Sequence, residues 1–214
     1  MLRFIQKTRN LSDQDCVEYF NVLKSNKSVR HGSYKKISSK GIIYSEGFYN
    51  QGTKDSLWKY YNTNGILIKS GRYVSDKKVS KWGFYNENGN PDLTFNFSTN
   101  ELIAFSLDDK EKNKKYNITT GDGVIMDELD RPPLYLGGKA DMVNFIGSNL
   151  RYPIIASENG ITGKVEIAFT IDSLGQTSNF RVTKEIGSGC DEEALRVVKM
   201  LPERWLPGII KDKK

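Results

Sequence analysis

Aromatic and glycine residues recur at a fixed interval through the first half of the chain. Pairs of identical residues lie 24 positions apart: Trp58 and Trp82, Tyr61 and Tyr85, Gly65 and Gly89, Gly47 and Gly71, and Tyr49 and Tyr73. A pattern that recurs at a constant period indicates a repeat architecture, in which each copy is one small structural unit. The sequence therefore predicts a repeat domain that begins near His31.

Each period contains two short aromatic stretches separated by turn residues. The dipeptides Asn64-Gly65 and Asn88-Gly89 supply the positive φ that a tight hairpin turn requires. Repeated hairpins of this kind pair edge to edge into one antiparallel β-meander, and neighbouring copies bury an aromatic stripe. Each unit is too small to be stable alone, so the copies depend on one another.

A different pattern occupies the second half of the chain. From Gly163 to Asp172, apolar and polar residues alternate, which is typical of a strand with one buried face. The segment that ends at Gly175 is a hairpin turn with glycine where positive φ is needed. Phe180 and Val182 lie on the return strand. We therefore expect a β-hairpin over residues 163–184.

An amphipathic helix follows the predicted hairpin. Asp191 is a suitable N-cap, and Glu192 and Glu193 in the first turn favour the helix dipole. The apolar residues of the segment fall on one helical face: Ala194, Leu195, Val197, Val198 and Leu201. Pro202 ends the helix near Trp205, whose indole is expected to cover the hairpin.

Two prolines mark the clearest boundary in the chain. Pro132-Pro133 denies donors to a sheet and forces extended backbone. Residues 139–150 then place apolar side chains at helical spacing, which predicts a short helix packed on the C-terminal domain. The expected fold class is α+β, with a β-repeat domain at residues 1–118, a linker at residues 119–138 and a C-terminal domain at residues 139–214.

Composition and charge narrow the classes of function. The 32 basic and 26 acidic residues give a net charge of +6, but no block of about five or six like charges occurs, so nucleic-acid binding is not expected. Cys16 and Cys190 match no metal or redox spacing and are interpreted as isolated thiols. No run predicts a transmembrane segment or a signal peptide. Either the chain works in the cytoplasm or its targeting segment lies outside this sequence.

Catalytic chemistry is not indicated. The single histidine, His31, has no patterned nucleophile beside it. Cys190 precedes a predicted helix start, where a thiol pKa is lowered, but a small packed residue is the preferred interpretation. The sequence contains no convincing cofactor or metal motif. We therefore expect a protein that is not an enzyme and that binds no cofactor or metal.

The repeat pattern GxYxxGxKxxxWxxYxxNG resembles MORN-type repeats of the variant found in bacterial YwqK-like proteins, over residues 32–97. Two copies depart from the pattern, with Ser56-Leu57 and Ser80-Lys81 in place of the usual glycine before tryptophan. The resemblance implies an interaction or spacer scaffold, and lipid binding has been claimed for some relatives. The aromatic residues themselves are interpreted as repeat core.

The second half carries a dense set of family positions: Tyr152-Pro153, Gly160, Gly163 to Val165, Phe169, Ile171, Asp172, Gly175, Val182, Gly187, Gly189 to Arg196, Met200, Pro202, Trp205 and Pro207-Gly208. These positions resemble the C-terminal domain of TonB-like energy transducers, in the form common in the Bacteroidetes. The resemblance implies a periplasmic or envelope location and contact with outer-membrane transporters, whose short segment is captured as an added strand.

Two departures from that family are expected to matter. After Pro207-Gly208 the chain continues with the charged residues 209–214, so the last strand of the domain is expected to be missing. The inner-membrane anchor and the long proline-rich span of a transducer are also absent from this sequence. An exposed sheet edge is therefore expected where the family normally has a further strand.

The sequence predicts a non-enzymatic, TonB-like protein-binding module of the cell envelope that acts in transmembrane transport by β-augmentation. Its predicted partner is an outer-membrane transporter or a TonB-box-like segment of one. The residues predicted to contact the partner are Tyr152, Pro153, Ser178, Phe180, Val182 and Lys184. The alternative is a structural or regulatory scaffold whose repeats bind lipid or another protein and whose C-terminal domain forms a homodimer.

Overall fold

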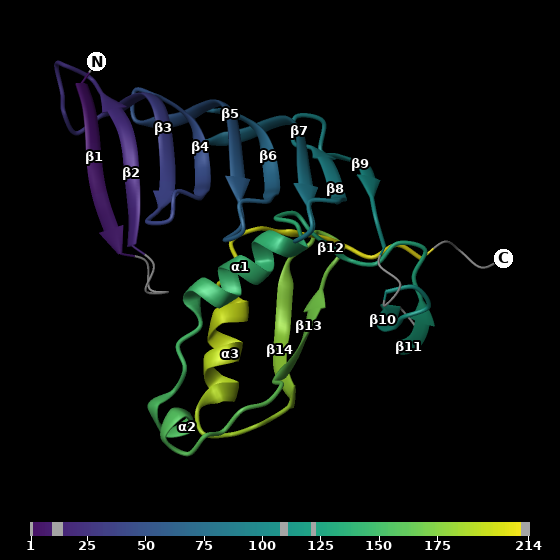
Figure 1. Cartoon of the computed structure of the whole chain (residues 1–214). Helices are drawn as coiled ribbons and strands as arrows, with labels where there is room; N and C mark the ends of the chain where they lie inside the picture. The colour runs from purple at the N-terminus through teal and green to yellow at the C-terminus, as the bar shows by residue number, and fades with distance from the viewer. Residues whose placement is uncertain (1, 10–14, 108–110, 121–122, 211–214) are drawn as a thin grey trace. The chain divides into compact units, whose positions relative to one another are not determined.

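The computed structural model of the chain describes residues 2–9, 15–107, 111–120 and 123–210 (Figure 1). The chain forms two compact units. The N-terminal unit contains Met1–Ser106 and Gly137–Ser148, and the C-terminal unit contains Leu107–Leu136 and Asn149–Lys214. The chain therefore passes between the units at three places.

The N-terminal unit is built on a nine-stranded antiparallel sheet in which each strand pairs with the next along the chain (Figure 1). The strands are β1 (Leu2–Arg9), β2 (Asp15–Val22), β3 (Arg30–Ser38), β4 (Ile43–Asn50), β5 (Thr53–Tyr61), β6 (Leu67–Val74), β7 (Lys77–Tyr85), β8 (Pro91–Asn96) and β9 (Glu101–Phe105). The predicted antiparallel meander is confirmed, and two strands precede the first predicted repeat.

The 24-residue period of the sequence recurs in the packing of the tryptophans. Trp58 Nε1 donates to the Phe48 carbonyl at 3.0 Å, and Trp82 Nε1 donates to the Arg72 carbonyl at 3.1 Å. Each buried indole lies against a glycine of the neighbouring strand, where a Cβ would collide with the ring. These glycines are Gly47 and Gly71. The close approach of ring and backbone explains why glycine recurs with tryptophan.

The turns between strands recur at the same interval. Asn62 Oδ1 accepts hydrogen bonds from the backbone N–H groups of Asn64 and Ile66, both at 3.0 Å. The equivalent contacts form around Asn86. The glycine of each Asn-Gly pair has positive φ, as the sequence predicts for these turns.

A cation from each period lies over the aromatic rings. Lys54 Nζ is 4.7 Å from the centroid of the Trp58 ring, and burial lowers the pKa of this lysine. The equivalent pairs one period earlier and one period later are Arg30 with Tyr34 and Lys78 with Trp82. The rings are thus packed core, and cation–π contacts add to their burial.

Helix α1 (Lys139–Asn149) is attached to the meander. Lys69 Nζ lies 2.6 Å from Asp141 Oδ2, and the backbone N–H of Lys139 donates to Asp92 Oδ2 at 3.1 Å. The prediction that this helix packs on the C-terminal domain is wrong. Helical periodicity gives the apolar face of a helix, but these charged contacts from β6 and the start of β8 determine where it attaches.

Three two-stranded sheets and two helices make up the described part of the C-terminal unit. The pairs are β10 (Lys115–Thr120) with β11 (Gly123–Glu128), β12 (Leu134–Tyr135) with β15 (Trp205–Leu206), and β13 (Glu166–Ile171) with β14 (Thr177–Lys184). The helices are α2 (Ile154–Glu158) and α3 (Cys190–Lys199). Strands β11 and β12 fall within residues 119–138, for which the sequence predicts a linker.

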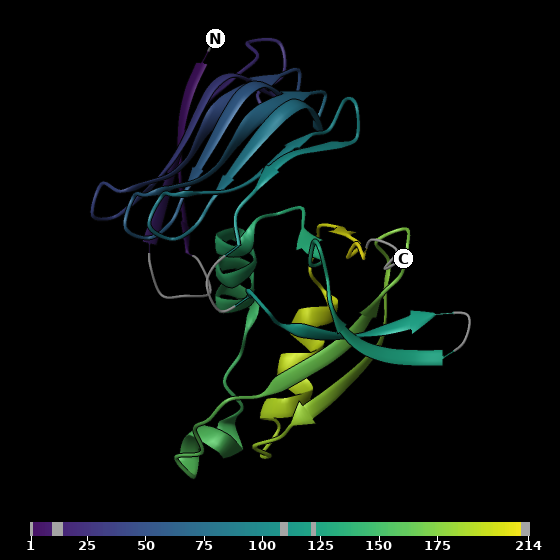
Figure 2. The same ribbon diagram turned by 90° about the vertical axis from the view of Figure 1, so that its right-hand side faces the viewer.

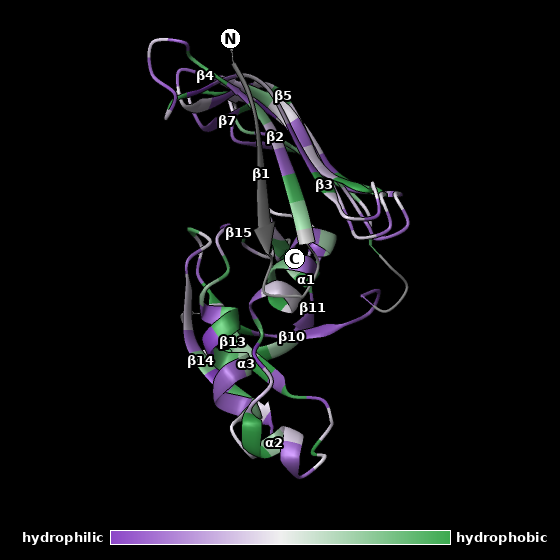
Figure 3. Ribbon diagram, turned by 60° about the vertical axis from the view of Figure 1, so that its left-hand side comes forward, coloured by the Kyte–Doolittle hydropathy of each residue, from purple (hydrophilic) through white to green (hydrophobic). Residues whose placement is uncertain are grey.

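Trp205 packs against aromatic rings from two different strands of the C-terminal unit. Its ring centroid is 5.4 Å from that of Phe169 on β13 and also 5.4 Å from that of Tyr135 on β12. The indole therefore covers the hairpin, as predicted. Helix α3 is amphipathic, with hydrophobic and hydrophilic residues on the same short helix (Figure 3), and Val197 is fully buried. None of the helices in the described segments is long and apolar enough to cross a membrane.

Candidate protein-binding edge of the C-terminal unit

Strand β14 has an open edge. Strands β13 and β14 run side by side (Figure 2), and no other strand of the described segments pairs with β14. An unpaired edge presents N–H and C=O groups to which a further strand can bind. Past α3, β15 pairs with β12. The sequence predicts that residues 209–214 do not form the last strand of the family. Of these, residues 211–214 lie outside the described segments.

The register of the hairpin determines which side chains share a face. The paired residues include Glu166 with Lys184, Ile167 with Val182, and Ala168 with Arg181. Opposed residues share a face, and neighbours along β13 alternate between faces. Val182 therefore lies on one face, and Arg181 and Lys184 lie on the other. The register shift between Glu166 and Ile167 gives β14 an extra residue, which separates Lys184 from the face of Val182.

The inner face of β14 is the one that packs in the hairpin and against α3. Phe180 stacks on the phenylalanine of β13 with ring centroids 5.2 Å apart, and Lys199 Nζ of α3 is 5.7 Å from the Phe180 ring. Val182 is half-buried on this face. Ser178 and Lys184 are exposed on the opposite, outer face. The four predicted contact residues on β14 are thus divided between packing and surface.

Tyr152 and Pro153 lie ahead of this hairpin in the chain. Tyr152 is 53% exposed, and its hydroxyl donates to the Ile161 carbonyl. Pro153 precedes α2, and a Cβ added to Gly189 would lie 3.3 Å from the Pro153 side chain. The structure therefore anchors these two predicted contact residues on the loop before β13 and on the turn that starts α3.

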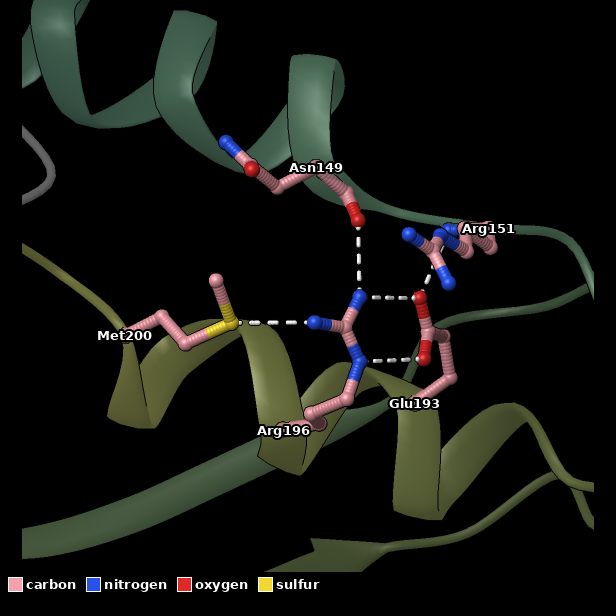
Figure 4. Close-up of polar contacts among 5 residues, drawn as sticks. All are labelled: Asn149, Arg151, Glu193, Arg196 and Met200. Carbon is pink, nitrogen blue, oxygen red and sulfur yellow. Dashed lines mark hydrogen bonds and ion pairs between the residues drawn. The ribbon is translucent and has the colours of Figure 1, made fainter. Parts of the chain in front are cut away.

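Five residues form a polar cluster that the sequence analysis did not predict (Figure 4). Arg196 binds both carboxylate oxygens of Glu193 at 2.7 Å, and its Nη2 also donates to the Asn149 carbonyl at 2.8 Å. The Arg151 N–H donates to Glu193 at 2.7 Å, and Met200 Sδ accepts from Arg196 at 2.9 Å. This cluster, the α3 clamp, ties the chain before Tyr152 to the helix.

The α3 clamp keeps Glu193 ionised. The side chain of Arg196 and the backbone N–H of Arg151 lower the pKa of Glu193 to about 2. The sequence alone predicts that Glu193 favours the helix dipole. The spacing of three between Glu193 and Arg196 was a usable signal for their ion pair. The contact with Asn149 required knowledge of the tertiary structure.

Asp191 has a different role from the one expected. Helix α3 begins at Cys190, and its N-cap is Gly189, whose φ of 84° is left-handed. Asp191 therefore falls in the first turn, where its carboxylate accepts hydrogen bonds from the N–H groups of Ile186 at 3.0 Å and Gly187 at 2.8 Å. The residue fastens the loop after β14 to α3, so the prediction of Asp191 as N-cap is wrong.

The residues considered for catalysis have structural surroundings. Cys16 and Cys190 are both buried. His31 Nδ1 accepts a hydrogen bond from the backbone N–H of Gln51 at 3.3 Å. Within the described segments, no group of three or more histidine, cysteine or carboxylate side chains is placed to hold a metal ion.

The C-terminal unit thus combines a two-stranded hairpin, whose β14 edge is unpaired within the described segments, with an amphipathic helix. Residues 148–214 match the family model for the Gram-negative bacterial TonB protein C-terminal. This match supports the TonB-like assignment of the C-terminal part, and that family is a non-enzymatic, protein-interacting family of the cell envelope. No curated protein matches the chain.

Proposed function

We propose that the chain is a protein-binding module of the cell envelope that acts in transmembrane transport. Its C-terminal unit binds an extended segment of a partner, such as an outer-membrane transporter, by β-augmentation on β14. The meander, which resembles MORN-type repeats, serves as a scaffold. The proposed location is the periplasm, where the TonB-like match and a transporter partner fit together.

The observation that carries this proposal is the open edge of β14. One side of this eight-residue strand is paired with β13, and its face toward α3 is packed through Phe180 and Val182. The strand is therefore held in a fixed register before a partner arrives, which lowers the ordering cost of binding. Main-chain hydrogen bonds along the open edge then supply affinity.

The test is an amide NMR titration of the full chain with TonB-box peptides taken from transporters encoded near it. We expect the amide signals of residues 177–184 to shift and to exchange more slowly with solvent, whereas those of the meander stay unchanged. The matched control is the same peptide with alternate backbone nitrogens methylated, because it keeps its side chains but loses donors. Equal shifts with both peptides, or no shift at high micromolar concentration, would count against strand addition.

Tyr152 and Pro153 are proposed as flanking contacts of the same partner. Tyr152 presents an exposed ring, and the α3 clamp fixes the backbone just before it. A Tyr152→Ala variant is expected to bind the transporter peptide about threefold to tenfold more weakly, which is the usual range for a contact of moderate importance. Its amide spectrum without peptide should match the wild type outside residues 150–162.

A second candidate function is a structural or regulatory scaffold whose repeats bind lipid or another protein and whose C-terminal unit dimerises. The observation that favours it is the β10–β11 hairpin, where Val124 and Met126 are each 66% exposed. Adjacent exposed apolar side chains on a two-stranded hairpin are typical of an interaction surface. Light scattering and liposome flotation of the full chain separate the two: a stable dimer that Met126→Gln abolishes, or vesicle binding, favours this candidate.

A further inference from the structure

The open edge of β14 is bordered by three exposed cations. Arg181 and Lys184 lie on the outer face of the strand, and Lys199 projects from α3 over the inner face at Phe180. Within the described segments no carboxylate forms an ion pair with any of the three. A concentration of like charge along a binding edge favours a ligand of opposite charge.

The carboxylate of the hairpin that lies opposite Lys184 is already occupied. Glu166 on β13 is opposite Lys184 in the register, and its Oε1 lies 2.9 Å from Lys164 Nζ. Glu166 also lies on the paired side of β14, away from the open edge. It partly offsets the charge of Lys184 but places no carboxylate where an added strand would lie.

A bulge in β14 places Arg181 and Lys184 on the same face of the strand. Arg181 and Lys184 are three residues apart in sequence, yet both are on the outer face because of the extra residue in β14. On a regular strand that pairs with β14, the residues opposite Arg181 and Lys184 are two positions apart, at i and i+2, and therefore lie on one face. Side chains directly opposed across such a pair have Cβ atoms about 5 Å apart, within reach of an ion pair.

We propose that the segment that binds β14 is acidic at alternate positions and apolar at the positions between them. Its carboxylates lie on the outer face beside Arg181 and Lys184, and its apolar side chains lie on the inner face beside Phe180 and Val182. This inference rests on the proposed function, because it names the chemistry of the strand added at the same edge. Arg181 and Lys184 are the specificity-determining residues, and Lys199 adds to the field.

The test uses three eight-residue peptides, the length of β14, titrated into the full chain by calorimetry. One alternates valine with glutamate, one valine with glutamine and one valine with lysine. We expect the glutamate peptide to bind about tenfold or more tightly than the glutamine peptide at low salt, since charge pairs at an interface act mainly through complementarity. The difference should shrink as ionic strength rises through 0.15 M and beyond, where the Debye length falls to about 8 Å.

A charge-reversed variant makes the residue assignment specific. The double substitution Arg181→Glu and Lys184→Glu should reverse the order, so that the lysine peptide binds most tightly. Both side chains are exposed, and circular dichroism checks that the variant is folded. The matched control is Lys27→Glu, an exposed lysine of the N-terminal unit, which should leave the order unchanged.

The outcomes separate this inference from the function beneath it. Equal, salt-independent binding of the glutamate and glutamine peptides would overturn the acidic segment while leaving strand addition intact. Failure of all three peptides and of the transporter peptides would overturn both. A dimer broken by Arg181→Glu with Lys184→Glu, together with no peptide binding, would instead assign the edge to a second copy of the chain and also overturn the proposal.

Discussion

Glu193 shows how one residue acquires a second role from tertiary contacts. As the third acidic residue of the first turn of α3, it favours the helix dipole. In the folded unit it also receives two hydrogen bonds from Arg196 and one from the Arg151 backbone. Helix position alone predicts only the first role. The second role connects α3 to the segment that carries Tyr152.

Replacing Glu193 by glutamine should weaken the α3 clamp. The amide cannot accept a charge-assisted, bidentate pair from Arg196. We expect thermal unfolding of the C-terminal unit at pH 7 to shift down by about 2–4 °C, the scale of one partly exposed ion pair. The measurement is a circular dichroism melt, with Glu192→Gln as control because Glu192 is exposed and adjacent. Equal shifts in the two variants would contradict a specific role for Glu193.

The stabilisation from Glu193 should depend on pH in a defined direction. The pKa of Glu193 is lowered from its ordinary value of 4.5 to about 2 in the folded unit. The contribution is therefore complete above pH 4.5 and is lost as the pH falls towards 2. Melts of the wild type and of Glu193→Gln should converge across this window. A constant difference between pH 5 and pH 2 would contradict the assignment.

Gly71 should tolerate no side chain. A Cβ at this position would collide with the Trp82 indole, and overpacking of this kind costs about 1–3 kcal/mol. Gly71→Ala should therefore lower the free energy of unfolding of the meander by about that amount in urea denaturation. Gly147→Ala is the matched control, because Gly147 lies in α1 with no atom within 4 Å of an added Cβ. That variant should be neutral or slightly stabilised.

At the scale of elements, charged contacts decide where α1 attaches. Its N-terminal residue is bound to Asp92, and Asp141 in its first turn is paired with Lys69. The side chains of Lys69 and Asp141 are only 14% and 20% exposed, so loss of one partner leaves a poorly solvated charge. The first turn of α1 is therefore held to the meander by electrostatic contacts and by local packing.

Asp141→Asn is expected to loosen α1 from the meander. The variant leaves Lys69 without its ionic partner. The free energy needed to open α1 away from the meander should therefore fall by about 1–3 kcal/mol. Hydrogen exchange of the α1 amides should then be about tenfold or more faster, with little change in β3 and β4. The exchange of partners, Lys69→Asp with Asp141→Lys, should recover part of the protection. No recovery and no acceleration would show that packing alone holds the helix.

At the scale of the whole molecule, the C-terminal unit is assembled from segments on both sides of α1. Strand β12 at Leu134–Tyr135 pairs with β15, and Arg131 forms an isolated bridge with Ile209. The TonB-like match begins only at residue 148. The matched segment therefore leaves out part of its own structural support, which lies upstream of α1.

A fragment of residues 148–214 should be less ordered than one of residues 107–214. The shorter fragment lacks Tyr135, which packs on Trp205, and Trp205 is the only tryptophan in either fragment. We expect its fluorescence emission to shift to longer wavelength and its thermal transition to broaden, because the indole gains contact with water. Tyr135→Ala in the longer fragment should reproduce part of the red shift. Identical spectra for the two fragments would show that β12 is dispensable.

The sequence by itself determined the elements whose signals are local. The 24-residue period predicts the meander and its buried aromatic stripe, because each repeat contacts its neighbours in the chain. Alternation over residues 163–172 and the Asp172–Gly175 turn predict the β13–β14 hairpin. Helical spacing predicts α3, and the position of Trp205 predicts that its ring covers the hairpin. These predictions rest on side-chain periodicity and turn chemistry, which a single segment carries.

Only the tertiary structure decided the attachments and the faces. The partner of α1, the pairing of β12 with β15 and the α3 clamp each join segments far apart in sequence, and no local pattern specifies such pairs. The outer-face position of Lys184 depends on an extra residue in β14, which reverses the expected alternation with Val182. The open edge of β14 is likewise a property of pairing. The chemistry expected of its ligand therefore follows from the register of the hairpin as well as from the residues it contains.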